Sequence, residues 1–332
     1  MTVKDHNVID QYYFFGKVFY VSSPHKEVLN KIRVLWQPFY RKGRRLKPKA
    51  VFHIPAFSRS RLSQSIPRIS NDNLLWWRSR QKFIRCDFTG NPWQVTIQYA
   101  AMPKVPNPAF LDPLTSDVLF LFRNALKRLG LICIHSGTVA KNGRGVLIPA
   151  VSGGGKTTTV LQLIRHNFKY ISEDQVFLRE NGRGIEALGY PSNLGLLDKS
   201  VSFFPELKFL EKTPYVQCGD RYKKSLGLKK LRELYPGCLA KKTQVKLLVF
   251  PKISRVRKAR VEKISKPQAL VQMLREDNWD YDAGMKDSVA LKKQWELYSR
   301  LCQSVPAYRL YVGRMSAEIP KLISKLLSGD RD

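Results

Sequence analysis

The sequence predicts a mixed α/β protein: a phosphate-loop domain whose sheet contains antiparallel hairpins, preceded by a small α+β unit. Three observations lead to this class. An apolar run at 145–148 leads into the loop Ser152-Gly153-Gly154-Gly155 and then into an amphipathic helix. Asn142-Gly143 and Asn181-Gly182 each separate two apolar runs, a strong hairpin signal that argues against a purely parallel sheet. Runs of aromatic and β-branched residues before residue 112 are typical of strands.

Residues 1–112 are expected to form the small α+β unit. Its expected elements are a strand at 11–21, a helix that begins after Ser22-Ser23-Pro24, and strands at 83–88 and 93–100. Arg41–Lys49 is a basic loop, and the proline-rich segment Met102–Pro113 is the expected linker. No group of residues typical of catalysis stands out here, and we expect this unit, together with residues 198–300, to recognise the acceptor.

Residues 113–332 are expected to form the phosphate-loop domain. Periodicity places helices at 112–129, 157–167, 267–275, 289–301 and 316–327. Apolar runs place strands at 131–140, 145–148, 168–171, 176–178, 185–188, 245–250 and 308–312. Residues 198–243 show no clear period, and no element is predicted for them.

Composition limits the class of protein. Lys and Arg number 58 against 26 Asp and Glu, a formal charge of +32. This charge attracts anions such as nucleotides, acidic peptides, nucleic acid or an anionic membrane, although a well-solvated basic surface explains it equally well. The five cysteines form no C-x-x-C pair, which argues against metal or disulfide frameworks and for a reducing compartment. Without a signal peptide or a stretch of about 20 apolar residues, a cytoplasmic protein with no membrane span is expected.

The loop at 150–157 follows the pattern G-x-x-x-x-G-K-[ST], with Ala150 in place of the first glycine. Glycines let backbone N–H groups close around a phosphate, and the helix start adds partial positive charge. Lys156 would reach the β- and γ-phosphates, and the Thr157 hydroxyl would bind Mg²⁺. The expected nucleotide-binding residues are Ser152, Gly153, Gly154, Gly155, Lys156, Thr157 and Thr158. A glycine-rich turn without a ligand is the alternative.

Two acids, Glu173-Asp174, follow Lys156 after one helix and one strand, and His135 precedes the loop. This arrangement, with the hairpin before the loop, resembles the HPr kinase family and its relatives of the PEP carboxykinase-like fold, over about residues 116–190. LLVFP at 247–251 and PAYRLYVG at 306–313 extend the resemblance more weakly towards HPr kinase-related proteins.

The resemblance implies roles for individual residues. Lys156 would contact the transferring phosphoryl group, and Thr157 and Asp174 would hold Mg²⁺. Glu173, where the family has Asp, would accept the proton of an attacking hydroxyl, with His135 beside it. No E-I-R-G-x-G-I segment is present, so HPr itself is not the expected acceptor.

We therefore expect a Mg²⁺- and ATP-dependent kinase that phosphorylates a hydroxyl, with serine as the favoured acceptor. The serine would belong to a peptide such as a lasso-peptide precursor, to a small protein, or to the free amino acid. Because relatives of this fold often assemble, a homo-oligomer is also expected. Two alternatives stay open: a basic P-loop ATPase acting on nucleic acid, for which no recognisable nucleic-acid fold is seen, and a nucleotide-binding scaffold without transferase activity, to which Ala150 and Glu173 point.

Overall fold

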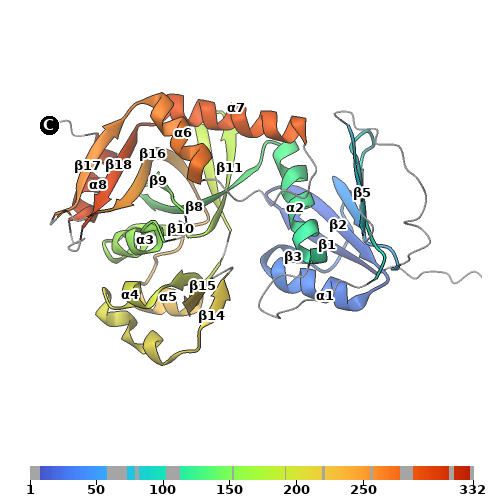
Figure 1. The fold of residues 1–332 in the computed structure, drawn as a ribbon, viewed down its shortest axis with the longest axis horizontal. Coiled ribbons are helices and arrows are strands. Elements are labelled where there is room, and N and C mark those ends of the chain that lie inside the picture. The colour runs from blue at the N-terminus through green and yellow to red at the C-terminus, as the bar shows by residue number, and fades with distance from the viewer. Residues whose placement is uncertain are drawn as a thin grey trace, which may run out of the picture. The chain divides into compact units, whose positions relative to one another are not determined.

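The chain folds into two compact units, and the mixed α/β class expected from the sequence is confirmed (Figure 1). The computed structural model describes residues 8–57, 73–78, 82–101, 113–151, 153–190, 192–218, 221–254, 256, 258–276, 287–313 and 318–329. Met1–Arg128 and Tyr281–Leu291 make up the first unit; Leu129–Asp280 and Lys292–Asp332 make up the second. Most of the expected linker lies outside the described residues.

The first unit is built on one mixed sheet. Its strands are β1 (Val8–Phe14), β2 (Lys17–Ser23), β3 (Tyr40–Arg41), β4 (Ala50–His53), β5 (Leu74–Arg78), β6 (Lys82–Asp87) and β7 (Trp93–Tyr99), in the order β3-β1-β2-β4-β7-β6-β5. The prediction of one strand at 11–21 is wrong, because the chain reverses at Phe15 and Gly16 and β1 pairs with β2 as a hairpin. Phe15 and Gly16 have positive φ angles of 45° and 91°. The glycine adopts this conformation without steric cost.

An aromatic core holds the helices α1 (Lys26–Leu35) and α2 (Pro113–Arg128) and the short 3₁₀ helix η1 (Gln37–Phe39) in the first unit. The ring of Phe14 lies 4.0 Å from that of Phe39 and 4.3 Å from that of Phe122, and Trp36 lies 4.4 Å from Phe122. Phe122 belongs to α2, so this helix packs with the first unit. The expected division at 112/113 therefore differs from the compact units in two segments, because residues 113–128 and 281–291 both belong to the first unit.

The second unit is built on a larger mixed sheet. Its strands are β8 (Ile132–Lys141), β9 (Arg144–Pro149), β10 (Lys169–Ser172), β11 (Gln175–Asn181), β12 (Gly184–Gly189), β16 (Lys242–Ile253), β17 (Arg260–Ile264) and β18 (Ala307–Val312). They run in the order β10-β8-β11-β12-β16-β18-β17, and β9 pairs with both β8 and β16. Both predicted hairpins are confirmed, β8–β9 at Asn142-Gly143 and β11–β12 at Asn181-Gly182. Strand β16 runs parallel to β9 and β18.

Helices cover both faces of this sheet, which explains why β8 and β9 are buried along almost their whole length (Figure 1). Alternate residues of β9 enter different apolar clusters: Val146 and Ile148 join one, and Leu147 the other. The first cluster contains residues of α3 (Lys156–Arg165) and α8 (Ile319–Ser328), and the second contains residues of α6 (Lys266–Glu276) and α7 (Ser288–Ser304). Within the described residues, no helix is long and apolar enough to cross a membrane.

Most of the segment 198–243, for which no element was predicted, forms a small subdomain of the second unit together with the strand that precedes it. It contains β13 (Leu194–Leu196), α4 (Asp198–Val201), the 3₁₀ helix η3 (Pro205–Lys212), β14 (Val216–Cys218), β15 (Arg221–Leu226) and α5 (Leu228–Leu234), with its strands in the order β13-β15-β14. Leu194, Leu196 and Leu226 share an apolar cluster with residues of α3. Packing against α3 therefore fixes this subdomain close to the glycine-rich loop.

Candidate active site

The glycine-rich loop between β9 and α3 has the backbone geometry of an anion-binding turn. Gly153 and Gly155 have φ angles of 84° and 97°, which side chains other than glycine rarely adopt. Gly155 is the N-cap of α3, and no side chain caps this helix start. The first backbone N–H groups of α3 therefore lack a capping side-chain partner, and such N–H groups at a helix start are those that bind phosphate in other proteins. Ala150 is buried and its φ is not positive, so the alanine fits without strain. Ser152 lies outside the described residues.

A glycine in β8 lets α3 approach the sheet closely. A Cβ on Gly137 would lie 2.6 Å from Val160 Cγ2 and 3.1 Å from Lys156 Cγ. Only glycine leaves room for these side chains, so Gly137 sets the position of the Lys156 stem against β8. This role was not evident from the sequence, because it depends on which residue of β8 faces the helix.

The two acids occupy the turn between β10 and β11, and both strands pair with the same strand, β8. Ser172 is opposite Thr138, and Gln175 is opposite His135. The hydroxyl of Ser172 donates a hydrogen bond to the carbonyl oxygen of Gln175 and closes the turn. This register carries Glu173 and Asp174 to the part of β8 where His135 lies, as the sequence spacing indicated.

His135, Lys156 and Asp174 form a triangle of polar contacts. His135 Nε2 lies 3.1 Å from Asp174 Oδ1, Lys156 Nζ lies 3.6 Å from the same oxygen, and Lys156 Nζ is hydrogen-bonded to His135 Nε2. One imidazole nitrogen either accepts a hydrogen bond from Lys156 or donates one to Asp174, but not both at once. Which of the two hydrogen bonds His135 makes therefore depends on where the Lys156 amine is engaged.

Glu173 is placed differently from its neighbour. Its carboxylate accepts a hydrogen bond from the Thr157 hydroxyl, and the residue is 4% exposed. The Asp174 side chain is 40% exposed. The sequence predicts His135 beside Glu173, and the structure places His135 Nε2 3.1 Å from Asp174 Oδ1. The hydroxyl of Thr158, also expected to bind nucleotide, lies 3.1 Å from Ser200 Oγ of α4.

Burial and charge shift two pKa values in this group. Burial lowers the pKa of Lys156, although the carboxylates of Glu173 and Asp174 oppose this effect. Partial burial alone would raise the pKa of Asp174. With His135 Nε2 donating to Asp174, that hydrogen bond and the positive charge of Lys156 outweigh this effect and lower the pKa of Asp174 to about 2. Asp174 is therefore a carboxylate throughout the physiological pH range.

Two basic residues of β15 add positive charge that the sequence did not reveal. The Arg221 guanidinium lies against the loop, since a Cβ on Gly153 would be 2.6 Å from Arg221 Nη1. Lys223 acts electrostatically on both Lys156 and Asp174. Residues two apart in a strand share a face, so β15 directs both side chains to the same side. In the sequence, Lys223 stands out only as half of the charge pair Lys223-Lys224, and the proximity of Arg221 and Lys223 to the loop depends on the subdomain's packing.

Oxygen donors suited to Mg²⁺ are present at the start of α3. The Thr157 hydroxyl and the Glu173 carboxylate already contact each other, and hard oxygen ligands are those that Mg²⁺ prefers. Across the described residues, no cluster of three or more His, Cys, Asp or Glu side chains could hold a metal ion alone. Mg²⁺ commonly takes only one or two carboxylates and completes its shell with substrate phosphates and water.

Comparison with known proteins gives limited information. A solved structure, that of the Hpr(Ser) kinase/phosphatase from Coxiella burnetii, is similar to this chain at a TM-score of 0.28 and 12% sequence identity. The alignment covers 59% of this chain and 94% of that one. No family model matches the sequence, and no curated protein matches it. A likeness this weak carries no argument, so the function proposed below rests on the residues of the site.

Proposed function

We propose that this protein is a kinase that transfers the γ-phosphoryl group of ATP to a hydroxyl, with serine in a peptide or small protein as the favoured acceptor. The supporting observation is the convergence of Lys156, His135 and Asp174 beside an uncapped, glycine-rich helix start. A glycine-rich turn with only a structural role would not need a buried lysine, a histidine and a carboxylate at its end. Phosphoryl transfer requires mainly positioning and charge neutralisation, which this short list of residues supplies.

The donor side consists of the loop and Lys156. The N–H groups at the start of α3 would bind the phosphates, and Lys156 would leave the carboxylate of Asp174 to neutralise the transferring group. Arg221 and Lys223 would add to this neutralisation from β15. Because burial disfavours the charged form of Lys156 without a ligand, an anionic phosphate would restore the charge that the transfer step needs.

The metal side consists of Thr157 and Glu173. Their hydroxyl and carboxylate oxygens would hold Mg²⁺, which when bound neutralises charge that develops on the phosphate oxygens. This assignment gives Glu173 the role that the family resemblance implied for Asp174. Its support is the hydrogen bond between Thr157 and Glu173 at the start of the helix, where the phosphate-loop hydroxyl and an acid share the metal in P-loop enzymes.

Asp174 is then the residue that receives the acceptor hydroxyl. The hydroxyl oxygen forms a bond to the γ-phosphorus, the bond from that phosphorus to the β-γ bridging oxygen breaks, and the hydroxyl proton passes to Asp174. With a pKa of about 2, Asp174 is a weak base, so its main contribution is to orient the hydroxyl while the proton moves late. His135 holds this carboxylate in place through its Nε2 atom.

A transfer assay with the full chain tests this proposal. The protein is incubated with γ-labelled ATP, Mg²⁺ and either free serine or a panel of serine- and threonine-containing peptides, and phosphate monoesters are identified by mass spectrometry. Lys156→Met and Asp174→Asn should each lose at least about a hundredfold in rate. Glu233→Gln, which removes an exposed acid of α5, is the control and should retain the wild-type rate.

The same preparation distinguishes the nucleic-acid alternative. If the +32 charge served nucleic acid, an oligonucleotide would stimulate ATP hydrolysis with a steep dependence on salt, and no acceptor would gain phosphate. That result would reject the kinase proposal. Nucleotide binding without transfer to any hydroxyl acceptor would instead indicate the scaffold.

A further inference from the structure

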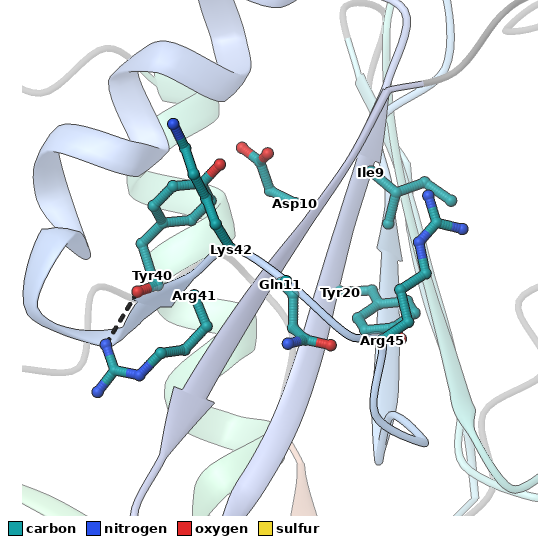
Figure 2. A pocket seen from close by; sticks show the side chains of 9 residues that line it. Ile9, Asp10, Gln11, Tyr20, Tyr40, Arg41, Lys42 and Arg45 are labelled. Carbon is teal, nitrogen blue, oxygen red and sulfur yellow. Dashed lines mark hydrogen bonds between the residues drawn. The ribbon is translucent and has the colours of Figure 1, made fainter.

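A small pocket lies in the first unit, along the edge of the sheet formed by β1 and β3 (Figure 2). Its volume is about 160 Å³, and it is lined by Ile9, Asp10, Gln11, Tyr20, Tyr40, Arg41, Lys42, Gly43 and Arg45. Pockets for nucleotides and drug-sized molecules usually measure about 300–1,000 Å³. This pocket therefore accommodates one or two side chains rather than a nucleotide.

The charge that lines the pocket is positive and uncompensated. The only acid among its lining residues, Asp10, is buried, and both of its oxygens accept hydrogen bonds from Arg33, at 2.6 and 2.7 Å. Lys42 and Arg45 are exposed, and neither has an ion pair or hydrogen bond among the described residues. In Figure 2 the Lys42 chain extends beside Asp10 and the Arg45 chain beside Ile9. An anionic group would find two free cations here.

The pocket also borders a strand edge. Strand β3 pairs only with Gln11 and Tyr12 of β1. Among the described residues, no other strand pairs with this edge of β1, so Val8–Asp10 extends beyond the pairing. A strand edge of this kind can pair with an extended peptide through backbone hydrogen bonds, while neighbouring pockets take alternate side chains.

We propose that this pocket binds an extended, acidic peptide segment, with its backbone beside Val8–Asp10 and its carboxylates on Lys42 and Arg45. The proposal rests on the kinase function above, because it identifies this segment as part of the acceptor. The ring of Tyr40, which could otherwise stack on a base, has the Arg33 guanidinium 5.5 Å from its centroid. A backbone edge and an occupied aromatic face favour a peptide over single-stranded nucleic acid.

Binding of a labelled acidic peptide tests the site directly. The probe is a fluorescein-labelled peptide of alternating Glu and Val, titrated with the full chain in the absence of nucleotide and followed by anisotropy. Lys42→Glu/Arg45→Glu should weaken binding by about tenfold or more, since it reverses both charges at the pocket. Arg44→Glu/Lys47→Glu changes the net charge equally in the same exposed loop, outside the pocket lining, and should weaken binding by less than about threefold.

A second peptide tests the contribution of the strand edge. The same sequence, N-methylated at alternate residues, keeps every carboxylate but loses backbone donors, and should bind at least about tenfold more weakly. Equal losses in the two double variants would show general electrostatic attraction and overturn the proposal. The proposal would also be overturned if the wild type did not bind the peptide. It would be overturned as well if the N-methylated peptide bound as tightly as the unmodified one and oligodeoxythymidine displaced the peptide. Peptide binding without phosphate transfer would support this peptide site and contradict the proposed kinase function. Phosphate transfer without peptide binding would support the kinase function and contradict the peptide site.

Discussion

His135 Nε2 lies 3.1 Å from Asp174 Oδ1, and both atoms are in contact with Lys156 Nζ. The histidine comes from β8, the aspartate from the turn after β10, and the lysine from the first residue of α3. The contact places the acid proposed to receive the hydroxyl beside the lysine proposed to bind phosphate, so movement of Lys156 towards a phosphate would leave His135 as the neighbour of Asp174 in this group. The neighbouring acid, Glu173, accepts a hydrogen bond from the Thr157 hydroxyl.

This separation predicts different kinetic consequences for the two neighbouring acids. Glu173→Gln should raise the Mg²⁺ concentration needed for half-maximal activity by about tenfold or more, because it removes a carboxylate ligand. Asp174→Asn should lower kcat by about 10²–10³ with an unchanged Mg²⁺ requirement. Steady-state rates over a Mg²⁺ titration measure both effects. An altered Mg²⁺ requirement in Asp174→Asn alone would restore the roles first expected from the sequence.

Asp174 also makes the free energy of unfolding depend on pH. Its pKa is about 2 in the folded chain against an ordinary 3.8, so between these values the unfolded chain binds more protons. The stabilisation from Asp174 is therefore complete above pH 3.8 and is lost as the pH falls towards 2. Urea-unfolding midpoints of the wild type and Asp174→Asn should differ near neutral pH and converge towards pH 2. A constant difference would contradict the lowered pKa.

Much of the second unit could be predicted from the sequence, because local signals agree there with the tertiary fold. Asn142-Gly143 and Asn181-Gly182 form the expected hairpins, and the glycine-rich loop stands between the expected strand and helix. The arrangement of Glu173 and Asp174 could not be predicted. Adjacent residues in one turn have nearly the same sequence spacing from Lys156, and only the register of β10 and β11 on β8 determines which acid faces His135.

The small subdomain and the start of the first unit were harder to predict for other reasons. Strands β13 and β14 have three residues each, too few to show a period, so the contribution of Arg221 depended on tertiary packing. In the first unit, the sequence at 12–21, YYFFGKVFYV, is rich in aromatic and apolar residues on both sides of the turn. Only the positive φ angles of Phe15 and Gly16 divide the run into a hairpin.

The lowered pKa of Lys156 predicts that ATP binding takes up protons. Without ligand, burial disfavours its charged form, whereas bound phosphates would favour it, so Lys156 should gain a proton at alkaline pH on binding. Isothermal titration calorimetry in two buffers of different ionisation enthalpy measures this uptake. Lys156→Arg is the matched control, because a guanidinium stays protonated, and its binding enthalpy should not depend on the buffer. A buffer-independent enthalpy in the wild type would contradict the prediction.

Phe122 of α2 should be a main source of stability for the first unit. It is 2% exposed and its ring contacts those of Phe14, Phe19 and Trp36. Phe122→Ala should therefore destabilise the protein by about 3–5 kcal/mol, the usual cost of a large aromatic cavity. Val34→Ala, at an 81% exposed position of α1, should change the free energy of unfolding by less than about 0.5 kcal/mol. Chemical denaturation of both variants checks the contrast, and similar losses would show that α2 does not anchor this core.

Gly137→Ala should disturb the site without altering any polar residue. The new Cβ would lie 2.6 Å from Val160 Cγ2 and 3.1 Å from Lys156 Cγ, so α3 would have to move away from β8. Overpacking of this kind costs about 1–3 kcal/mol, and it should weaken ATP binding because the Lys156 stem shifts with the helix. Gly182→Ala is the matched control, since its Cβ would meet nothing within 4 Å.

A double-mutant cycle with Val160→Ala separates the steric cause from a general loss of stability. Shortening Val160 removes the atom that the new Cβ would meet, so Gly137→Ala/Val160→Ala should be less destabilised than the sum of the single variants by about 0.5 kcal/mol or more. Part of the ATP affinity should return with it. Strict additivity would mean that Gly137 acts on β8 itself, and that the close approach of α3 does not determine where Lys156 stands.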